Sequence, residues 1–239
     1  MRGCFITFEG GEGAGKSTQI ERLRRRLEGF GHAILVTREP GGSPKAEAIR
    51  KLVLAGKVKE RGPFAEALLF SAARIDHLDQ RIRPALEQGI HVLCDRFADS
   101  TRAYQGARGG VSLERLKGLE RVVVGDTAPD LTIILDLPPA AGLARARQRR
   151  EAKGEGTDRF EAEDAAFHEI LREAFLAIAR EEPGRCLVVD AAGDPDAVEE
   201  AVWSAVRDRL PVLAARSGAK PGEATPPGSD VEGATPHVA

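Results

Sequence analysis

The sequence predicts an α/β fold with three layers, α/β/α, around a five-stranded parallel sheet. Five apolar runs are too short for helices and too continuous for half-exposed strands, so we expect strands covered on both faces. These runs occupy residues 4–8, 33–37, 90–94, 131–135 and 186–189. The segments between them have helical spacing. Strands that alternate with helices imply right-handed crossovers, a parallel sheet and a ligand crevice at the carboxyl ends of the strands.

Two of the intervening segments carry clear helix signals. One has apolar residues at i, i+3, i+4, i+7, i+8 and i+11, which predicts a helix with one apolar face. This stripe consists of Phe167, Ile170, Leu171, Ala174, Phe175 and Ile178. The last helix is predicted to start with Asp194 as its cap and Pro195 at its first position.

Length and composition favour one domain followed by a tail. The chain has 239 residues, of which 42% are hydrophobic, and this is enough to bury one substantial core. We expect a single domain over residues 1–210 and a flexible tail over residues 211–239. The stretch 216–239 is rich in glycine and proline, and its only larger apolar residues are two valines, so it cannot bury much surface.

Charge and cysteine usage exclude several classes of partner. The formal net charge is −2, from 35 basic and 37 acidic residues, so no overall field recruits nucleic acid or an anionic membrane. The three cysteines lack C-x-x-C spacing and lie in predicted strands, which favours a reducing compartment. No apolar run approaches the roughly 20 residues that span a bilayer, and the first strand starts almost at Met1. We therefore expect a cytoplasmic protein.

A phosphate-binding loop follows the first predicted strand. Residues 10–17 read GGEGAGKS, which fits G-x-x-x-x-G-K-[ST], and an amphipathic helix comes next. In such a P-loop the backbone N–H groups turn toward phosphate oxygens, Lys16 reaches the β- and γ-phosphates, and Ser17 offers its hydroxyl to Mg²⁺. The fold is thus expected to be of the P-loop NTPase type. The predicted ATP-binding residues of this segment are Gly10, Gly11, Glu12, Gly13, Ala14, Gly15, Lys16, Ser17 and Thr18.

A P-loop alone predicts only nucleotide binding, so the acceptor must be argued from other residues. The chain contains no asparagine, which excludes the N-K-x-D element that reads guanine in GTPases. Asp95 and Arg96 follow the third predicted strand. An aspartate there can hold the hydration shell of magnesium and an arginine can fork onto a phosphate, although an ion pair that closes a loop is the alternative. Ser17 and Asp95 are therefore the candidate metal-binding residues.

Taken together, the motifs resemble those of bacterial thymidylate kinases (dTMP kinases). Residues 8–18 read FEGGEGAGKST, residues 95–105 read DRFADSTRAYQ, and residues 37–42 read TREPGG. Phe70 and Arg74 lie one turn apart on a later helix. The resemblance covers about residues 6–210 with the motifs in the family's order. It implies transfer of the γ-phosphate of ATP to dTMP with Mg²⁺, giving dTDP and ADP, in a homodimer.

For the base and sugar of the acceptor, the resemblance implies one role for each of five residues. Phe70 would stack on the thymine ring and Arg74 would donate to a base carbonyl. Thr101 and Gln105 would read the base edge, and Tyr104 would leave no space for a 2′-hydroxyl. Taken alone, Phe70 could be a core residue and Tyr104 could cap a hydrophobic edge.

The resemblance also implies the residues around the acceptor phosphate. Arg38, Arg50 and Arg96 would hold this phosphate, with an ordinary surface position as the alternative for the first two. Glu12 would reach the 3′-hydroxyl. Glu39 would sit beside the acceptor and the metal, before Pro40, whose peptide bond is implied to be cis.

A cluster of arginines lies between the fourth predicted strand and the next helix, where residues 145–150 read RARQRR. Phosphoryl transfer between two anions needs cations that arrive with the substrates and exclude water. We therefore predict a mobile basic lid over about residues 147–160, with a solvated helix face as the alternative for any single arginine.

The resemblance implies that lid arginines replace a cation missing from the P-loop, since Gly13 occupies a position that is basic in one style of the family. Arg147 and Arg149 are the favoured candidates for the transferring phosphoryl group, and Arg145 or Arg149 for the adenine side together with residues 190–194. The predicted catalytic residues are Lys16, Arg96, Arg147, Arg149 and Glu12. Two other readings stay open: a kinase for another deoxynucleotide, and a P-loop nucleotide-binding regulator that phosphorylates no small molecule.

Overall fold

The computed structural model describes residues 1–107, 110–153 and 163–216. Its sheet is parallel throughout, with the strand order β2-β3-β1-β4-β5. The strands are β1 (Phe5–Glu9), β2 (Ile34–Arg38), β3 (His91–Asp95), β4 (Leu131–Asp136) and β5 (Cys186–Asp190). Each overlaps a predicted apolar run with its ends shifted by no more than one residue, so the predicted five-stranded parallel sheet is confirmed.

Helices connect successive strands. The α-helices are α1 (Lys16–Gly29), α2 (Pro44–Leu54), α3 (Gly62–His77), α4 (Arg83–Glu87), α5 (Ala98–Ala107), α6 (Leu113–Val124), α7 (Pro139–Lys153), α8 (Ala165–Glu181) and α9 (Pro195–Arg209). Three short turns of other helix types are η1 (Lys59–Arg61), η2 (Leu78–Ile82) and η3 (Pro211–Ala214). Within the described ranges, none of these helices has the length and apolar character required to cross a membrane.

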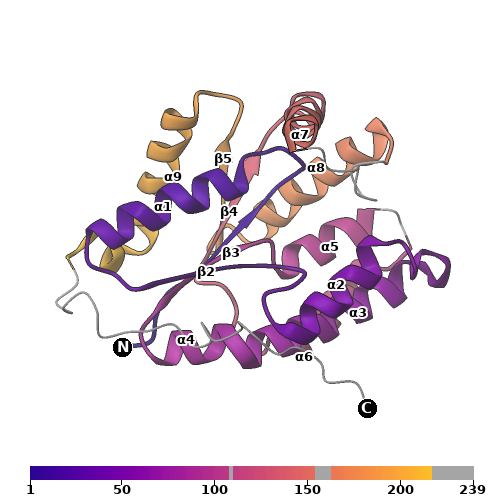
Figure 1. Cartoon of the computed structure of the whole chain (residues 1–239), viewed down its shortest axis with the longest axis horizontal. Helices are drawn as coiled ribbons and strands as arrows, with labels where there is room; N and C mark the ends of the chain where they lie inside the picture. The colour runs from indigo at the N-terminus through magenta and orange to yellow at the C-terminus, as the bar shows by residue number, and fades with distance from the viewer. Residues whose placement is uncertain (108–109, 154–162, 217–239) are drawn as a thin grey trace, which may run out of the picture.

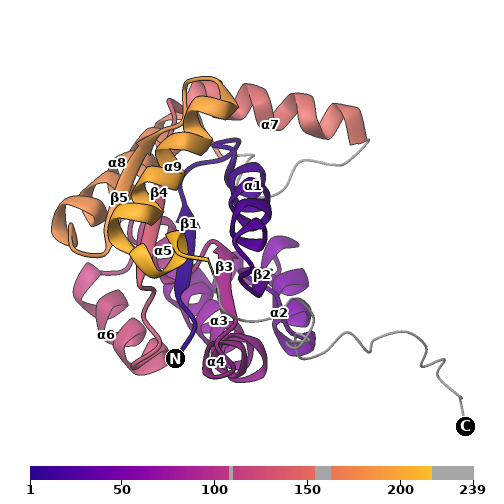
Figure 2. The same cartoon turned by 90° about the vertical axis from the view of Figure 1, so that its left-hand side faces the viewer.

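The central strands send alternate side chains into two helical layers. Ile6 and Phe8 of β1 pack with residues of α1 and α9, whereas Phe5 packs on the opposite face with residues of η2 and α4. On that second face Ile134 of β4 packs with α5 and α8. Figure 1 shows α1 and α9 on one side of the strands and α4, α5 and α8 on the other, and Figure 2 gives the perpendicular view. The three-layer prediction is confirmed.

The two edge strands are less covered than predicted. Val36 of β2 and Val188 of β5 are 42% and 41% exposed. The helical layers lie over the middle of the sheet, and an edge strand has a neighbouring strand on one side only. The expectation that every strand is covered on both faces is therefore wrong for β2 and β5.

The structure confirms the predicted cap of α9 and most of the predicted apolar face of α8. In α8, Phe167, Leu171 and Phe175 are buried as expected, but Ile170 is 50% exposed. Consecutive helix positions are about 100° apart, so Leu171 takes the place facing the sheet and Ile170 turns outward. For α9, the predicted cap is confirmed, because the side chain of Asp194 accepts a hydrogen bond from the backbone N–H of Asp196.

The chain continues to pack beyond residue 210. Leu213 in η3 is fully buried in the core formed by α1, α9 and the sheet. His32 Nε2 also lies 3.0 Å from the carbonyl oxygen of Ala215. The predicted start of the tail at residue 211 is therefore wrong for residues 211–216, because one large apolar side chain suffices to anchor the segment. Residues 217–239 of the predicted tail lie outside the described residues.

The chain's single tryptophan lies between α9 and α1. Trp203 is 7% exposed, and its ring stacks on Phe30 with 5.4 Å between ring centroids. The guanidinium of Arg26 lies 4.5 Å from the centre of the same ring. Since α1 starts at Lys16, this packing supports the helix that follows the phosphate loop.

Candidate active site

The P-loop connects the end of β1 to the start of α1 and touches a second segment. Gly10, Gly13 and Gly15 have φ values of 128°, 67° and 91°, a region that side-chain-bearing residues rarely adopt. A Cβ added to Gly13 would lie 2.0 Å from the carbonyl oxygen of Gly142 in α7. Conversely, a Cβ on Gly142 would lie 2.2 Å from the carbonyl oxygen of Glu12. The P-loop and the first turn of α7 therefore touch backbone to backbone.

The P-loop lysine is folded onto its own loop. Lys16 Nζ donates to the carbonyl oxygens of Gly10 and Gly11 at 3.1 and 2.8 Å. The pKa of Lys16 is lowered to about 8, mainly by burial and to a smaller extent by the nearby guanidinium of Arg96. The ammonium thus lies where phosphate oxygens would offer it better partners than backbone carbonyls.

The two candidate metal ligands are brought together. Ser17 Oγ donates to Asp95 Oδ2 at 2.8 Å, across the gap between α1 and the end of β3. A hydroxyl and a carboxylate are hard oxygen ligands, which suit Mg²⁺ when phosphate oxygens and water complete its shell. The residues present therefore fit a magnesium site.

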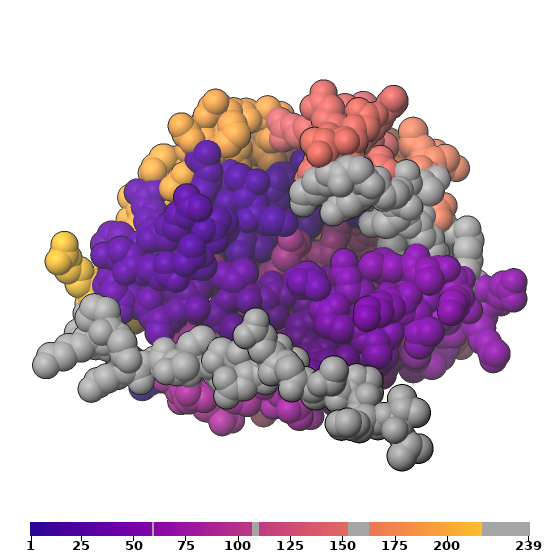
Figure 3. Space-filling model, viewed as in Figure 1, coloured from indigo at the N-terminus to yellow at the C-terminus, as the bar shows by residue number. Residues whose placement is uncertain are grey.

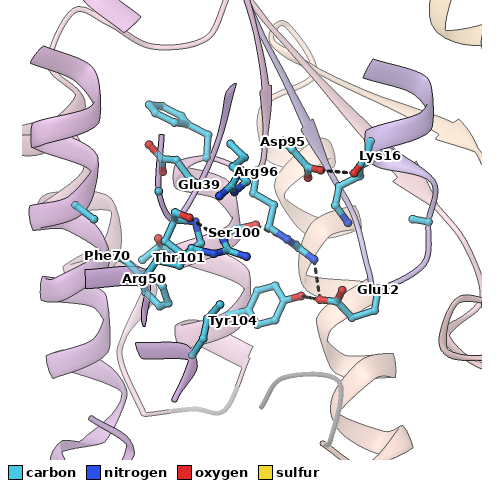
Figure 4. A pocket seen from close by; sticks show the side chains of 18 of the residues that line it. Glu12, Lys16, Glu39, Arg50, Phe70, Asp95, Arg96, Ser100, Thr101 and Tyr104 are labelled. Atoms are coloured by element: carbon cyan, nitrogen blue, oxygen red, sulfur yellow. Dashed lines mark hydrogen bonds and ion pairs between the residues drawn. The ribbon is translucent and has the colours of Figure 1, made fainter. Parts of the chain in front are cut away.

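Arg96 links the P-loop to the acceptor side. Its NH2 group donates to Glu12 Oε1 at 2.7 Å, and its NH1 group lies 3.2 Å from both the Gly10 carbonyl oxygen and Ser100 Oγ. The hydroxyl of Tyr104 donates to the same Glu12 oxygen at 2.7 Å. Figure 4 shows the side chains of Arg96 and Tyr104 pointing toward Glu12. The three predicted site residues therefore form one cluster.

This cluster keeps Glu12 ionised. Burial by itself would raise the pKa of Glu12, but Arg96, Lys16 and the Tyr104 hydroxyl outweigh it and hold the pKa at about 2. Its side chain is 15% exposed, as is that of Arg96. The carboxylate consequently neutralises cations that a phosphate would otherwise meet.

One cavity of about 460 Å³ joins the donor and acceptor sides. Figure 3 shows this face of the molecule hollowed between α7 and the pair α2 and α3. In Figure 4, Phe70 and Arg50 lie on one side of the cavity and Glu12 and Lys16 on the other. The predicted acceptor residues that line it are Arg38, Glu39, Pro40, Arg50, Phe70, Arg74, Arg96, Thr101, Tyr104 and Gln105; from the P-loop it is lined by Glu12, Gly13, Ala14, Gly15, Lys16, Ser17 and Thr18.

Arg74 is held in place by its neighbours on the floor of the acceptor pocket. Its Nε donates to Glu39 Oε2 at 2.7 Å and its NH2 group donates to Thr101 Oγ1 at 3.1 Å. The other oxygen of Glu39 lies 3.1 Å from His77 Nδ1. Glu39 thus orients Arg74, a contact that the sequence did not predict for it. The peptide bond between Glu39 and Pro40 is cis, as the resemblance implies.

The amide of Gln105 is oriented by an acid. Gln105 Nε2 donates to Glu66 Oε2 at 3.3 Å, and both side chains are buried. A carboxylate only accepts hydrogen bonds, so the amide nitrogen must face Glu66. Gln105 Oε1 is buried without a partner among the described residues, which leaves an acceptor available on this side chain.

Arg38 and Arg50 lie at the rim of the cavity. Arg38 is more than half exposed and its NH2 group donates to Glu47 Oε1 at 2.9 Å. Arg50 NH1 donates to the carbonyl oxygen of Pro40 at 2.8 Å. Both guanidinium groups face the same opening as Arg96, so the structure brings the three predicted phosphate-binding arginines to one cavity.

The arginines of the predicted lid separate into two groups. A second cleft of about 320 Å³ lies between the P-loop and residues 191–198, and Arg145 and Arg149 line it. Arg145 NH1 donates to the carbonyl oxygen of Ala191 at 3.2 Å, and Arg149 also lines the main cavity. Arg147 instead pairs with Glu151 at 2.8 Å and is 76% exposed. The structure therefore does not bring Arg147 to the site.

Helix geometry explains this division. Residues 147–153 of the predicted lid belong to α7, so this part of the segment is helical. Positions 145 and 149 are one turn apart on the same face, whereas position 147 is about 200° from 145. Residues 154–160 of the predicted lid lie outside the described residues.

Besides Glu66, sequence reasoning missed a second buried acid next to the site. Glu9, the last residue of β1, is 0% exposed. Its Oε1 accepts from the backbone N–H groups of Phe97 and Ser100 at 2.7 and 3.2 Å, and its Oε2 accepts from Ser100 Oγ at 2.6 Å. Burial and the nearby Asp99 raise the pKa of Glu9 to about 7. The available signal was an acidic residue that ends an otherwise apolar strand.

Comparison with known proteins gives a consistent result. Residues 8–202 match the family model described as thymidylate kinase. The chain is 61% identical over 210 residues to a thymidylate kinase of Bradyrhizobium diazoefficiens, covering 87% of this chain and 91% of that protein. It is 59% identical over 221 residues to one of Nitrobacter hamburgensis, covering 92% and 94%. The crystal structure of thymidylate kinase from Ehrlichia chaffeensis superposes with a TM-score of 0.67 at 32% identity, covering 87% of this chain and 99% of that one.

Proposed function

The chain belongs to the thymidylate kinase family, and we propose that it transfers the γ-phosphate of ATP to dTMP in the cavity between the P-loop and helices α3 and α5. The observation that carries this proposal is the cluster of Glu12, Arg96 and Tyr104. It joins the P-loop to the acceptor residues across a single cavity, as transfer between two bound nucleotides requires.

On the donor side, the P-loop amides and Lys16 hold the β- and γ-phosphates of ATP. Lys16 donates to two backbone carbonyls, which supports an exchange of these neutral partners for charged phosphate oxygens. Arg145 and Arg149 border the adenine side, since both line the cleft beside residues 191–198. This assignment leaves Arg147 as a surface residue.

Ser17 and Asp95 are the residues that would hold Mg²⁺. Magnesium supplies, when bound, positive charge that neutralises the phosphate oxygens during transfer. The 2.8 Å bond between the Ser17 hydroxyl and the Asp95 carboxylate supports this site, because both oxygens already point at the same place. Asp95 is the last residue of strand β3, so its position is fixed by the sheet.

On the acceptor side, Phe70 stacks on the thymine ring and Arg74 donates to a carbonyl of the base. Arg74 keeps its guanidinium in place through Glu39 and Thr101, which supports a fixed donor and not a mobile surface charge. Gln105 offers its Oε1, which suits the N3–H donor of thymine. Tyr104 packs against the sugar.

The catalytic contribution is positioning and charge. The acceptor phosphate is already a nucleophile at neutral pH, so no covalent enzyme intermediate is needed. Arg96, Arg38 and Arg50 hold the acceptor phosphate. When the dianion enters, Arg96 exchanges its bond to Glu12 for phosphate oxygens, and Glu12 turns to the 3′-hydroxyl of the sugar. Arg149 supplies a further cation where the two phosphates meet.

The proposed assembly is a homodimer formed through α3. Phe64, Leu68 and Ile75 are 43%, 46% and 44% exposed and are spaced by four and seven residues, so they share one face of the helix. A second copy of this stripe would cover the apolar surface. Leu68→Glu is expected to yield a monomer in sedimentation velocity. A wild-type protein that sediments as a monomer at micromolar concentration contradicts the dimer.

The three cysteines are unpaired, as in proteins of a reducing compartment, and we propose that the enzyme acts in the cytoplasm.

A coupled assay that follows ADP release tests the reaction. Purified full chain with Mg²⁺ and ATP should phosphorylate dTMP far faster than dCMP, dGMP or dAMP, with dUMP as the nearest competitor. Preference for another deoxynucleotide would replace the acceptor, and ADP release independent of any acceptor would indicate a nucleotide-binding regulator. Turnover of dTMP by Lys16→Ala at the wild-type rate would overturn the proposed site.

A further inference from the structure

The turn that carries Arg96 is unusual in its backbone. Arg96 has a φ of 67° and is the non-glycine residue with positive φ in the described part of the chain. Residues other than glycine rarely adopt this backbone conformation, so contacts with surrounding residues are needed to stabilise the turn. The direction in which Arg96 leaves the backbone depends on this turn.

Glu9 accepts hydrogen bonds from the residues that follow Arg96 in this turn. Its carboxylate accepts from the backbone N–H of Phe97 and from both the backbone N–H and the hydroxyl of Ser100. These groups lie on the C-terminal side of Arg96, while the backbone N–H of Arg96 donates to the Phe8 carbonyl oxygen at 2.9 Å. The end of β1 thus holds the turn on both sides of Arg96.

When Glu9 is ionised, as at pH 8, its bond to Ser100 has a fixed direction. An ionised carboxylate only accepts, so the Ser100 hydroxyl donates to Glu9 and keeps its lone pairs for Arg96 NH1, 3.2 Å away. Arg96 then reaches Glu12 through its other nitrogen at 2.7 Å. A directed chain therefore runs from Glu9 through Ser100 to the guanidinium.

We infer that Glu9 is a positioning residue for the acceptor-phosphate clamp, and that its carboxylate aims Arg96 through Ser100 and the backbone of residues 97–100. This inference rests on the proposed function, because it assumes that Arg96 holds the phosphate of dTMP. Glu9 is fully buried and is not among the residues that line the cavity, so it acts without touching the substrate.

A glutamine in place of Glu9 would keep the shape and change the direction of one bond. Its amide oxygen can still accept from the two backbone N–H groups, but its NH₂ group must donate where Oε2 accepted. The Ser100 hydroxyl then accepts from residue 9, and its hydrogen has to turn elsewhere. The expected result is a misdirected Arg96 with an intact fold.

The experiment compares Glu9→Gln, Ser100→Ala and the double variant at pH 8, where Glu9 is ionised. Each variant removes or redirects the hydrogen bonds that orient the Arg96 guanidinium. The KM and the calorimetric Kd for dTMP should therefore rise about tenfold or more. The KM for ATP should change by less than about threefold, since Lys16 and the P-loop amides are unaltered. The double variant should be no worse than Glu9→Gln alone, because both changes break one chain.

Thr7→Val serves as the matched control on the same strand. The Thr7 hydroxyl lies 2.7 Å from Thr132 Oγ1 and is fully buried, away from the cavity. This variant should lower the melting temperature and leave both KM values unchanged. If Glu9→Gln does not fold, Ser100→Ala carries the test alone, with circular dichroism to verify its structure.

Three results would overturn the inference. They are an unchanged affinity for dTMP in both single variants, a parallel loss of affinity for ATP and dTMP, and full additivity in the double variant. Wild-type turnover of dTMP decides the proposed function separately. Calorimetry of dTMP without ATP keeps the positioning role measurable whether or not transfer occurs.

Discussion

The close approach between the P-loop and α7 makes Gly142→Ala a sharp perturbation. A Cβ at this position would lie 2.2 Å from the backbone carbonyl oxygen of Glu12, whereas ordinary contacts start at about 3.4 Å. The two backbone segments must therefore separate by about 1.2 Å, because neither partner is a flexible side chain. The position has no positive φ, so conformational strain does not add to the effect.

The separation is expected to affect catalysis and not stability. Replacing glycine by alanine inside a helix stabilises it by up to about 1 kcal/mol, which offsets part of the clash. The shift moves α7, and with it Arg145 and Arg149, away from the phosphate loop. A misplacement of about 1 Å can cost 10²-fold in rate, so we expect kcat/KM for ATP to fall by about 10- to 100-fold.

Steady-state kinetics with dTMP at saturation, together with thermal unfolding, measures the effect. Gly118→Ala in α6 is the matched control, since the nearest group to its added Cβ is the end of a flexible arginine side chain at 4.0 Å. It should raise the melting temperature slightly and leave kcat/KM unchanged. Wild-type kinetics in Gly142→Ala would refute the required approach of α7, and a large drop in melting temperature would indicate unfolding in place of displacement.

Four further predictions concern the site. Lys16→Ala should reduce kcat below detection with an unchanged circular dichroism spectrum, because the β- and γ-phosphates lose their cation. Arg96→Ala should weaken binding of dTMP by about 3 kcal/mol in calorimetry, since the acceptor phosphate loses a guanidinium that binds it. Phe70→Ala should cost about 1–3 kcal/mol of dTMP affinity through lost stacking, with the KM for ATP unchanged. Glu12→Gln should lower the free energy of unfolding at pH 7 by about 3 kcal/mol, because the pKa of Glu12 in the folded protein, about 2, lies below the ordinary value of 4.5. At pH 3 the loss should be less than half as large, and thermal unfolding at both pH values measures it.

The fold follows from features that the sequence displays locally. Short apolar runs bounded by helical segments predict buried parallel strands, and the structure has them within one residue at each end. The exposure of Val36 and Val188 could not be predicted from these runs. It depends on which strands lie at the edges of the sheet, and the apolar runs do not contain the strand order. Leu213 illustrates the same limit, since a single apolar residue near a polar tail gives no periodic signal.

The site could be predicted where residues belong to contiguous motifs. The cavity gathers the P-loop, the segment after β3 and the pair Phe70 and Arg74. What the motifs do not contain is three-dimensional packing. Glu9 binds Ser100 across 91 residues of chain, and Gly142 meets Gly13 across a still longer stretch, so neither contact has a local sequence pattern. The run RARQRR does not reveal which of its arginines face the cavity, because that depends on the helical phase of α7.

The packing of Trp203 gives this protein a built-in optical reporter. Indole emission depends on exposure to water, and the only indole of the chain is enclosed by Phe30 and Arg26 at the far end of α1 from Lys16. Excitation at the red edge of the protein absorption band therefore monitors separation of α1 from α9 without interference from other tryptophans. A red shift of the emission would signal opening of that layer, whereas nucleotides that merely fill the cavity should leave the spectrum in place.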